Sequence, residues 1–201
     1  MVRPQIEYFY SAHSAYAYLG ARRLSQIADE AGWEIVHRPF DFLPVVAAAG
    51  GPPLAKRTQG HIDYFFGREL VRWAHWRDQP ILRHRPTHHD NALAPASGMI
   101  LASPDPTPLS AAILRAHWVD DADIADRATL IAIADEAGQD GGALFATGQS
   151  APVQAQFAAN TAEACARCVP GSPTYFVRGD MFYGQDRLEM IKFALGTPFP
   201  D

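Results

Sequence analysis

Ser14 is the first residue whose position suggests chemistry. The aromatic and β-branched residues 6–10 are typical of a buried strand, and apolar residues at helical spacing begin at Tyr16. Ser14 therefore lies where a strand gives way to a helix, and the unpaired backbone N–H groups at a helix start stabilise an anion. A cysteine there would have a lowered pKa, but residues 14–17 contain none. Either the hydroxyl only caps the helix, or it serves an anion that a ligand brings.

Two adjacent histidines, His88 and His89, lie in the segment RPTHHDNAL and are followed by Asp90 and Asn91. Adjacent side chains point in different directions on most backbones, and the H-x-x-x-H spacing of many metal sites is missing, so we expect no metal. One histidine could donate or accept a proton, because the pKa of imidazole suits neutral pH. Alternatively, the side chains of this segment hydrogen-bond to one another and hold a loop together.

Cys165 and Cys168 are the two cysteines of the chain and form a C-x-x-C pair. A single pair does not complete a structural zinc site. The pair ends a helical pattern that begins near Ser150, so it lies at the negative end of a helix dipole, which raises the pKa of a thiol. We therefore interpret both cysteines as packing residues without a redox role.

The composition is that of a globular protein with a mild negative charge. The chain has 201 residues, 48% of them hydrophobic, and a net charge of −5, which is enough apolar content for a core. Basic residues do not cluster among exposed aromatic ones, so nucleic acid is not an expected partner. The sequence has no run of 18 apolar residues and no secretory signal pattern at its start. We expect a soluble cytoplasmic protein without a membrane partner that acts on a small molecule.

The elements that position these residues begin with a βαβ unit. It comprises the strand at residues 6–10, a helix that ends at Gly32 and a strand at residues 33–39, and it implies a parallel pair of strands. Residues 40–53 are rich in Ala, Gly and Pro and predict a long loop. Helices are then expected at residues 57–77, at 109–119 behind an N-cap and first-turn proline at Thr107 and Pro108, at 123–137, and from Ser150 to about Cys168.

Strands return only at the end of the chain. Residues 174–178 and 181–183 flank a Gly179-Asp180 turn and predict a β-hairpin. A last helix is expected at about residues 186–195. The order of elements is therefore βαβ, then helices alone, then ββα.

This order resembles a thioredoxin fold interrupted by a helical domain, as in DsbA. Three stretches are similar to motifs of the glutathione-dependent 2-hydroxychromene-2-carboxylate isomerase and kappa-class glutathione transferase family: FYSAHSAYAYLG at residues 9–20, GSPTYFV at 171–177 and MFYGQDRL at 181–188. Arg72-Trp73 matches a further R-W pair. The resemblance implies an α/β fold with a discontinuous thioredoxin-like domain, residues 1–45 and 169–201, and a helical insertion, residues 46–168, whose last helix packs back on that domain.

The resemblance implies glutathione as cofactor. Ser14 would donate a hydrogen bond to the sulfur of bound glutathione, a charge-assisted contact to a thiolate. Ser172 would offer its backbone to the cysteinyl part, next to a cis Pro173. The amides of Gly184, Gln185, Asp186 and Arg187 would hold the γ-glutamyl carboxylate, with the Asp186 side chain on the ammonium group. An ordinary turn proline and a simple N-cap aspartate are the alternatives.

The resemblance also implies a substrate-binding loop, matched here by Lys56 and Arg57. Basic side chains in an apolar loop suit an acidic ligand, although solvated loop charges are the alternative. Asn91 corresponds approximately to an asparagine in the family, and we take His88 and Asn91 as further candidate substrate-binding residues.

The implied activity is a glutathione-dependent isomerisation. The thiolate would add reversibly to an unsaturated aromatic or ring-opened carboxylate, and elimination would return glutathione. Addition without elimination would make the protein a glutathione transferase, and a glutathione- or peptide-binding module without catalysis is a third reading. A DsbA-like thiol oxidoreductase needs a thiol at the helix start, and the positions where its cysteines would lie are Ser14 and Ala17, so this activity is not expected. Homodimers are common in this family, and we expect one here.

Overall fold

A computed structural model describes residues 3–51 and 56–200. Its four-stranded sheet has the order β2-β1-β3-β4. Strand β1 (Gln5–Tyr10) pairs in parallel with β2 (Glu34–Pro39) and antiparallel with β3 (Thr174–Val177), which pairs antiparallel with β4 (Asp180–Tyr183). The predicted βαβ unit and the predicted hairpin are both confirmed.

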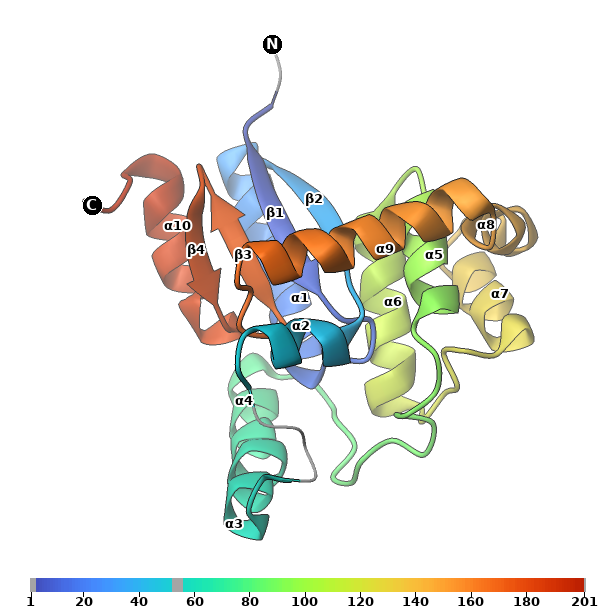
Figure 1. Ribbon diagram of the computed structural model, residues 1–201, viewed down its shortest axis with the longest axis horizontal. Helices are drawn as coiled ribbons and strands as arrows, with labels where there is room; N and C mark the ends of the chain where they lie inside the picture. The colour runs from blue at the N-terminus through green and yellow to red at the C-terminus, as the bar shows by residue number, and fades with distance from the viewer. Residues whose placement is uncertain (1–2, 52–55, 201) are drawn as a thin grey trace.

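Helix α1 (Ala15–Ala31) begins and ends where the sequence predicts. Ser14 is its N-cap, and Gly32 ends it in the left-handed region with φ 69°, which glycine adopts without steric cost. The helix covers one face of the sheet together with α10 (Leu188–Gly196), which follows the 3₁₀ turn η3 (Gln185–Arg187). Both helices lie on the side of the sheet opposite α9 in Figure 1.

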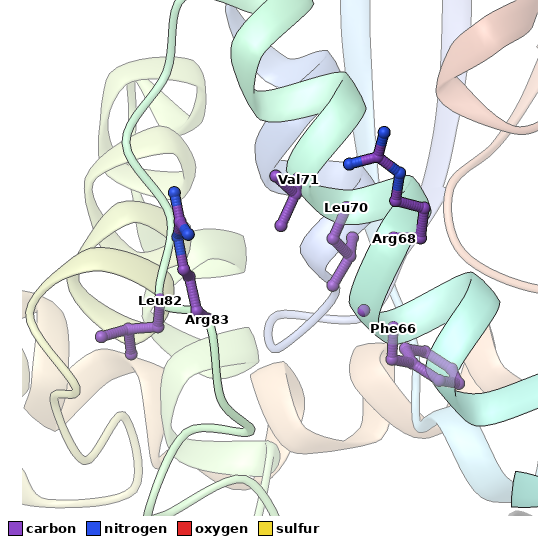
Figure 2. Close-up of a pocket in the computed structure, with 7 residues that line it drawn as sticks. Phe66, Arg68, Leu70, Val71, Leu82 and Arg83 are labelled. Carbon is purple, nitrogen blue, oxygen red and sulfur yellow. The ribbon is translucent and has the colours of Figure 1, made fainter.

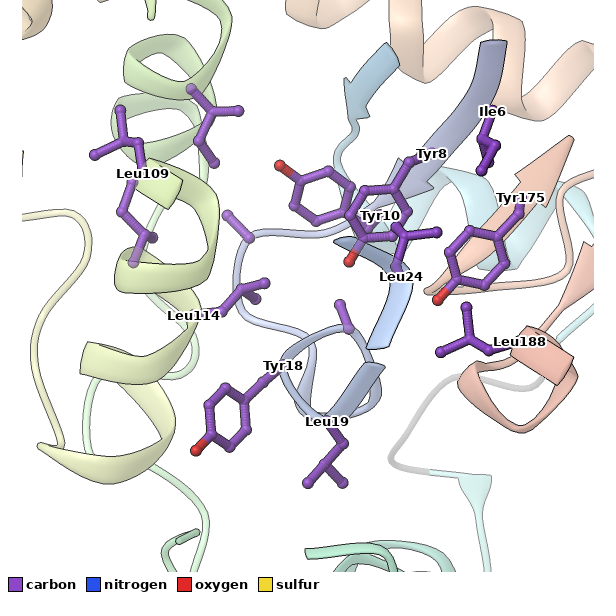
Figure 3. Packing of buried hydrophobic residues seen from close by; sticks show 14 of the residues in the cluster. Ile6, Tyr8, Tyr10, Tyr18, Leu19, Leu24, Leu109, Leu114, Tyr175 and Leu188 are labelled. Carbon is purple, nitrogen blue, oxygen red and sulfur yellow. The ribbon is translucent and has the colours of Figure 1, made fainter. Parts of the chain in front are cut away.

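Alternate residues of β1 separate the two faces of the sheet, as strand geometry requires. Tyr8 and Tyr10 stack with ring centroids 4.1 Å apart and face the α1 side, where Tyr175 stacks on Tyr8 at 5.3 Å (Figure 3). Phe9 points the other way into a second buried cluster with residues of α9 (Ala151–Ala166). The sheet is thus the middle of three layers.

The prediction of a loop over residues 40–53 is wrong at α2 (Phe42–Ala48), and residues 52 and 53 lie outside the described residues. Pro44 falls in the first turn of this helix, where its missing N–H costs no hydrogen bond. Val45 and Val46 are buried, Val45 in the same cluster as Phe9. Burial against α9 therefore outweighs the turn-forming composition of this stretch.

The remaining described elements are all helical and lie to one side of the sheet or below it in Figure 1. Their bounds are α3 (Gln59–Ile62), the π-helical segment η2 (Asp63–Arg68), α4 (Glu69–Arg77), α5 (Ala94–Ala102), α6 (Pro106–Val119), α7 (Arg127–Glu136) and α8 (Gly141–Gly148). Throughout residues 3–51 and 56–200, none of the helices is long and apolar enough to cross a bilayer. The division into a thioredoxin-like domain and an insertion stays a prediction.

Two helices of this region were not expected, and two helix starts were misplaced: α7 begins at Arg127 and not at residue 123, and the start of α6 also differs. Helices α5 and α8 cross so closely that a Cβ on Gly98 would lie 2.3 Å from the carbonyl oxygen of Gly148, so packing and not helix propensity stabilises them. Helix α6 begins at Pro106, and the predicted N-cap Thr107 is inside it. The Thr107 hydroxyl instead lies 3.0 Å from Nε2 of His37 on β2.

Candidate functional site

Three serines meet where β1 passes into α1. The Ser14 hydroxyl accepts a hydrogen bond from the Ala17 N–H at 3.2 Å, which caps α1, and donates one to the carbonyl oxygen of Ser172 at 3.2 Å. The Ser11 N–H donates to the Ser172 hydroxyl at 2.9 Å. All three serines are buried, and the Ser172–Pro173 bond is cis, as expected. The start of α1 and the turn before β3 are therefore held together by side-chain to backbone contacts.

The second predicted glutathione-binding segment joins the first through one backbone contact. The Gly184 N–H donates to the carbonyl oxygen of Pro173 at 2.9 Å. Gly184 has φ 98°, and a Cβ there would lie 2.3 Å from Oδ1 of Asp186, so only glycine fits. The structure thus brings Ser14, Ser172, Pro173 and Gly184 into one continuous region.

Gln185 and its neighbours divide between the interior and the surface. Gln185 is 1% exposed, and its Oε1 accepts a hydrogen bond from Arg77 at 2.9 Å. Its Oε1 therefore ties the turn after β4 to the end of α4, while its Nε2 is buried without a hydrogen-bond partner in the part of the chain that the structure describes. Asp186 and Arg187 pair with each other at 3.1 Å, and both side chains are substantially exposed.

The helical arm, which comprises α3, η2 and α4, lies over the start of α1. The Tyr16 hydroxyl donates to the carbonyl oxygen of Phe65 at 2.6 Å. Arg57, just before the arm, stacks on Phe66 at 5.7 Å and opposes the rise in the pKa of Tyr183 that burial causes. Arg57 is therefore close to the residue that precedes Gly184, whereas Lys56 is exposed.

The structure places His88 and Asn91 against Asp123. The Asn91 side chain donates to Oδ2 of Asp123 at 2.9 Å, and Nδ1 of His88 lies 3.7 Å from the same oxygen. These contacts hold the 85–93 loop to the segment after α6, in agreement with the alternative reading of a loop held by its own side chains. The two residues are not brought to Ser14.

His89 is the histidine that the structure turns toward the Ser14 loop, and sequence reasoning did not choose it over His88. Its ring centroid lies 4.4 Å from that of His13, and its Nδ1 lies 2.9 Å from Nε2 of His117. Burial lowers the pKa of all three imidazoles, that of His89 to about 4. The proximity of His89 and His117 lowers the pKa of His13 further, and the proximity of His117 lowers that of His89. The group is therefore neutral at pH 7.

An open cavity of about 370 Å³ separates the helical arm from the loop that follows it (Figure 2). Leu70, Val71 and Leu82 supply apolar walls, and Arg68 and Arg83 come from opposite sides. The Leu82 N–H donates to the carbonyl oxygen of Trp118, and Nε1–H of Trp118 donates to the carbonyl oxygen of His13 at 2.7 Å. One wall of the cavity is therefore bonded to the Ser14 loop. Apolar walls with two guanidinium groups suit a ligand that is both apolar and anionic. Neither arginine was predicted as a site residue, because the two lie 15 positions apart without a motif.

The two cysteines end α9, and the packing prediction is wrong for one of them. Cys165 is half-buried and packs on the cluster that contains Phe9. Cys168 is exposed and has φ 54°, so it forms the left-handed turn that ends the helix.

Comparisons with known proteins find relatives that match nearly the whole chain. The chain is 26% identical over 193 residues to the 2-hydroxychromene-2-carboxylate isomerase of Sphingobium xenophagum, which covers 94% of this chain and 97% of that protein. A solved 2-hydroxychromene-2-carboxylate isomerase superposes with a TM-score of 0.79 at 23% identity and covers 96% of this chain and 94% of its own. The cytosolic disulfide reductase DsbM from Pseudomonas aeruginosa with GSH gives a TM-score of 0.62 at 20% identity, covering 96% and 93%.

A family model spans almost the whole chain and rests on the same elements that build the site. The model of the DSBA-like thioredoxin domain matches residues 5–196, from the first strand to the last helix. With the four-stranded sheet and the helices described above, this match shows that the chain belongs to the DSBA-like thioredoxin domain family.

Proposed function

We propose that this protein is a glutathione-dependent isomerase of an unsaturated aromatic or ring-opened carboxylate. The likeness to an isomerase over nearly the whole chain supports the reaction class. The observation that carries the proposal is the placement of the Ser14 hydroxyl at the start of α1, 3.2 Å from the backbone of Ser172. This is where a thioredoxin-like fold stabilises a thiolate, and here the chain itself supplies no sulfur.

Glutathione would replace the contact between Ser14 and Ser172. The hydroxyl has one proton, which now goes to the Ser172 carbonyl, so it would turn toward the incoming sulfur and donate to the thiolate. The freed carbonyl would then accept the N–H of the cysteinyl residue. A solved relative at 20% identity, the disulfide reductase DsbM, is described with GSH, which is consistent with this use of the fold.

The γ-glutamyl end would lie along the turn after β4. The backbone N–H groups of Gln185 and Asp186 begin η3 and would bind its carboxylate. The exposed side chain of Asp186 would pair with the ammonium group, because the only ion pair of Asp186 within the described residues is with Arg187. Lys56 and Arg57 would then face the carboxylate of the second substrate, together with Arg68 and Arg83 at the cavity.

The reaction would proceed by reversible addition of the thiolate. Addition forms a carbon–sulfur bond and turns the substrate double bond into a single bond, about which the adduct rotates or opens a ring. Elimination breaks the carbon–sulfur bond and restores the double bond. Glutathione is regenerated, and nothing is oxidised or reduced.

The test is an isomerisation assay with 2-hydroxychromene-2-carboxylate, with and without glutathione. We expect turnover that requires glutathione and falls at least tenfold in Ser14→Ala, since a charge-assisted hydrogen bond contributes about 1.5–3 kcal/mol. Ser150→Ala is the matched control, because Ser150 precedes α9 without a side-chain cap bond. Full turnover by Ser14→Ala, or turnover without glutathione, would refute the proposal. A stable glutathione adduct as product would show a transferase, and glutathione binding with no turnover over a panel of unsaturated acids would show a binding module.

A homodimer and a cytoplasmic location complete the proposal. Tyr64, Phe65 and Phe66 of the arm are 41–49% exposed, and aromatic residues on one surface element favour association. Sedimentation of the whole chain at several concentrations measures the oligomeric state.

A further inference from the structure

Three imidazoles lie in contact beside the Ser14 loop, and each comes from a different part of the chain. His13 belongs to the β1–α1 loop, His89 to the loop before α5, and His117 to α6. The His89 ring lies 4.4 Å from His13 and 5.2 Å from His117, centroid to centroid. In the part of the chain that the structure describes, no group of three or more metal-binding side chains could hold a metal ion. The contacts therefore need another explanation.

Hydrogen bonding determines which nitrogen of each ring carries the proton. Nδ1 of His117 lies 3.3 Å from the carbonyl oxygen of Ala122, and because a carbonyl only accepts, Nδ1 is the protonated nitrogen. His117 is fully buried and neutral, so its Nε2 has a free electron pair. His89 must then donate its Nδ1–H to that Nε2 across 2.9 Å. The remaining nitrogen of His89, Nε2, is left unprotonated.

This arrangement leaves a proton acceptor next to the candidate site. Within residues 3–51 and 56–200, Nε2 of His89 has no hydrogen-bond partner, and the side chain is partly exposed. Trp118, the neighbour of His117 in α6, donates from Nε1 to the carbonyl oxygen of His13 at 2.7 Å. His117 and Trp118, which are consecutive in α6, therefore fix the position of His89 relative to His13, the residue before Ser14.

We propose that His89 is the proton-transfer residue of this site and that His117 is a positioning residue that keeps Nε2 of His89 free. The proton-transfer role of His89 rests on the proposed glutathione chemistry, whereas the positioning role of His117 does not. The His13 ring, 4.4 Å from that of His89, would line the pocket beside it.

In the proposed cycle His89 accepts, donates and finally returns a single proton. Glutathione loses its thiol proton to Nε2 of His89 as the thiolate forms on the hydroxyl of Ser14. Addition of the thiolate moves the electron pair of the substrate double bond toward the carboxylate-bearing end, and the proton on His89 neutralises the carbanion or enolate formed. His89 then takes this proton back, the electron pair re-forms the double bond as the carbon–sulfur bond breaks, and the expelled thiolate receives the proton from His89, so imidazole and glutathione leave the cycle unchanged.

The groups around His89 keep it neutral in the free protein. His13, His117 and Arg85 face it; His117 and Arg85 disfavour its protonated form, Asp90 favours that form, and burial has the largest effect on its pKa. Arg85 and Asp90 form an ion pair with each other at 2.7 Å. A thiolate and a carboxylate brought by ligands would raise the pKa of His89, which prepares it to hold the transferred proton only when the site is filled.

Nitrogen-15 NMR of the histidine-labelled whole chain without ligand tests the positioning role. We expect His89 and His117 to be protonated at Nδ1, and His117→Phe to move the His89 proton to Nε2. His117→Gln should restore the Nδ1–H form, because the amide oxygen can accept from His89. Protonation of His89 at Nε2 in the unaltered protein would overturn the inference whatever the enzyme does.

Kinetics with 2-hydroxychromene-2-carboxylate and glutathione test the proton-transfer role. His89→Ala should lower kcat about 100-fold and leave glutathione affinity within about twofold, since general acid–base catalysis contributes about 10²–10⁴-fold. His117→Phe should lower kcat about tenfold, and His117→Gln should restore most of that kcat. The control is His75→Gln, because His75 is exposed on α4, and it should leave kcat unchanged. Unchanged turnover in His89→Ala would overturn the role. Absence of turnover in the unaltered protein would overturn the proposed function and the transfer step, and the tautomer would still be decided by NMR.

Discussion

The hydroxyl of Ser14 donates to the carbonyl oxygen of Ser172 across 158 positions of sequence. The same hydroxyl caps α1 by accepting from the Ala17 N–H, so one side chain stabilises the helix and joins the two ends of the thioredoxin-like region. Capping and a catalytic role are therefore not exclusive readings of Ser14. The cap uses a lone pair of the oxygen, and the proposed chemistry uses its proton.

Ser14→Ala should destabilise the protein as well as impair turnover. We expect a loss of about 1 kcal/mol in the free energy of unfolding, which is typical for removal of a serine N-cap. Urea unfolding followed by circular dichroism measures it. Ser14→Asn should restore most of the stability, because asparagine caps helices equally well, and a stability of Ser14→Ala equal to that of the unaltered protein would show that the cap contributes nothing.

Arg77→Ala should destabilise the turn that carries Gly184 and Asp186. The guanidinium of Arg77 bonds both the side chain and the backbone oxygen of Gln185, and its removal leaves buried acceptors unpaired, at a cost of about 1–3 kcal/mol. Glutathione affinity, measured by calorimetry, should fall with it. Arg115→Ala is the control, because the pair of Arg115 with Asp120 is exposed and such pairs contribute about 0–1 kcal/mol. Equal effects of the two variants would contradict this prediction.

Gly20→Ala should be destabilising although alanine favours helices. A Cβ at this position would lie 2.8 Å from Cβ of Gln185 and 3.2 Å from the hydroxyl of Tyr175, so α1 would have to move away, at a cost of about 1–3 kcal/mol. Gly196→Ala is the matched control near the end of α10, because nothing lies within 4 Å of the added carbon. Thermal unfolding of both variants decides the matter, and the prediction fails if Gly20→Ala is the more stable of the two.

Stability should fall in mild acid, with His37 as one cause. Burial lowers the pKa of His37 from 6.5 to about 4 in the folded chain. Between these values the unfolded chain binds a proton that the folded chain does not, so the contribution is complete above pH 6.5 and is lost as the pH falls toward 4. The slope is at most about 1.4 kcal/mol per pH unit for one histidine.

Urea unfolding between pH 7 and pH 4 measures this dependence. His37→Gln should flatten the profile and His75→Gln should leave it unchanged. His37→Gln also loses imidazole contacts with Tyr10 and Thr107, so the slope and not the absolute stability is the quantity to compare. An unaltered slope in His37→Gln would exclude His37 as a cause.

Arg68→Glu and Arg83→Glu should weaken binding of a carboxylate substrate without weakening that of glutathione. Both side chains line the cavity beside the arm, and a reversed charge there repels an anion. We expect KM for 2-hydroxychromene-2-carboxylate to rise about tenfold, which corresponds to about 1.4 kcal/mol. Arg127→Glu, on α7, is the control, and an equal rise in that variant would point to net charge alone.

The sequence by itself determined the elements whose signals are local. Ser14 and Gly32 mark the ends of α1, the Gly179-Asp180 turn joins β3 to β4, and the segments around Ser172 and Gly184 carry motifs at fixed spacing. Each signal depends on a few neighbouring residues and their backbone preferences. The order of elements could therefore be predicted before any contact was known, whereas the glutathione region is what the resemblance of the motifs implies.

The tertiary structure alone decided what depends on contacts between distant segments. It turns His89 toward the Ser14 loop, with His117 on another helix as its partner, and it forms α8 from a glycine-rich stretch because Gly148 fits closely against Gly98. It also brings Arg68 and Arg83 to one cavity. Local sequence preferences either did not predict these arrangements or predicted a different one, since packing and pairing energies arise only when the chain has folded.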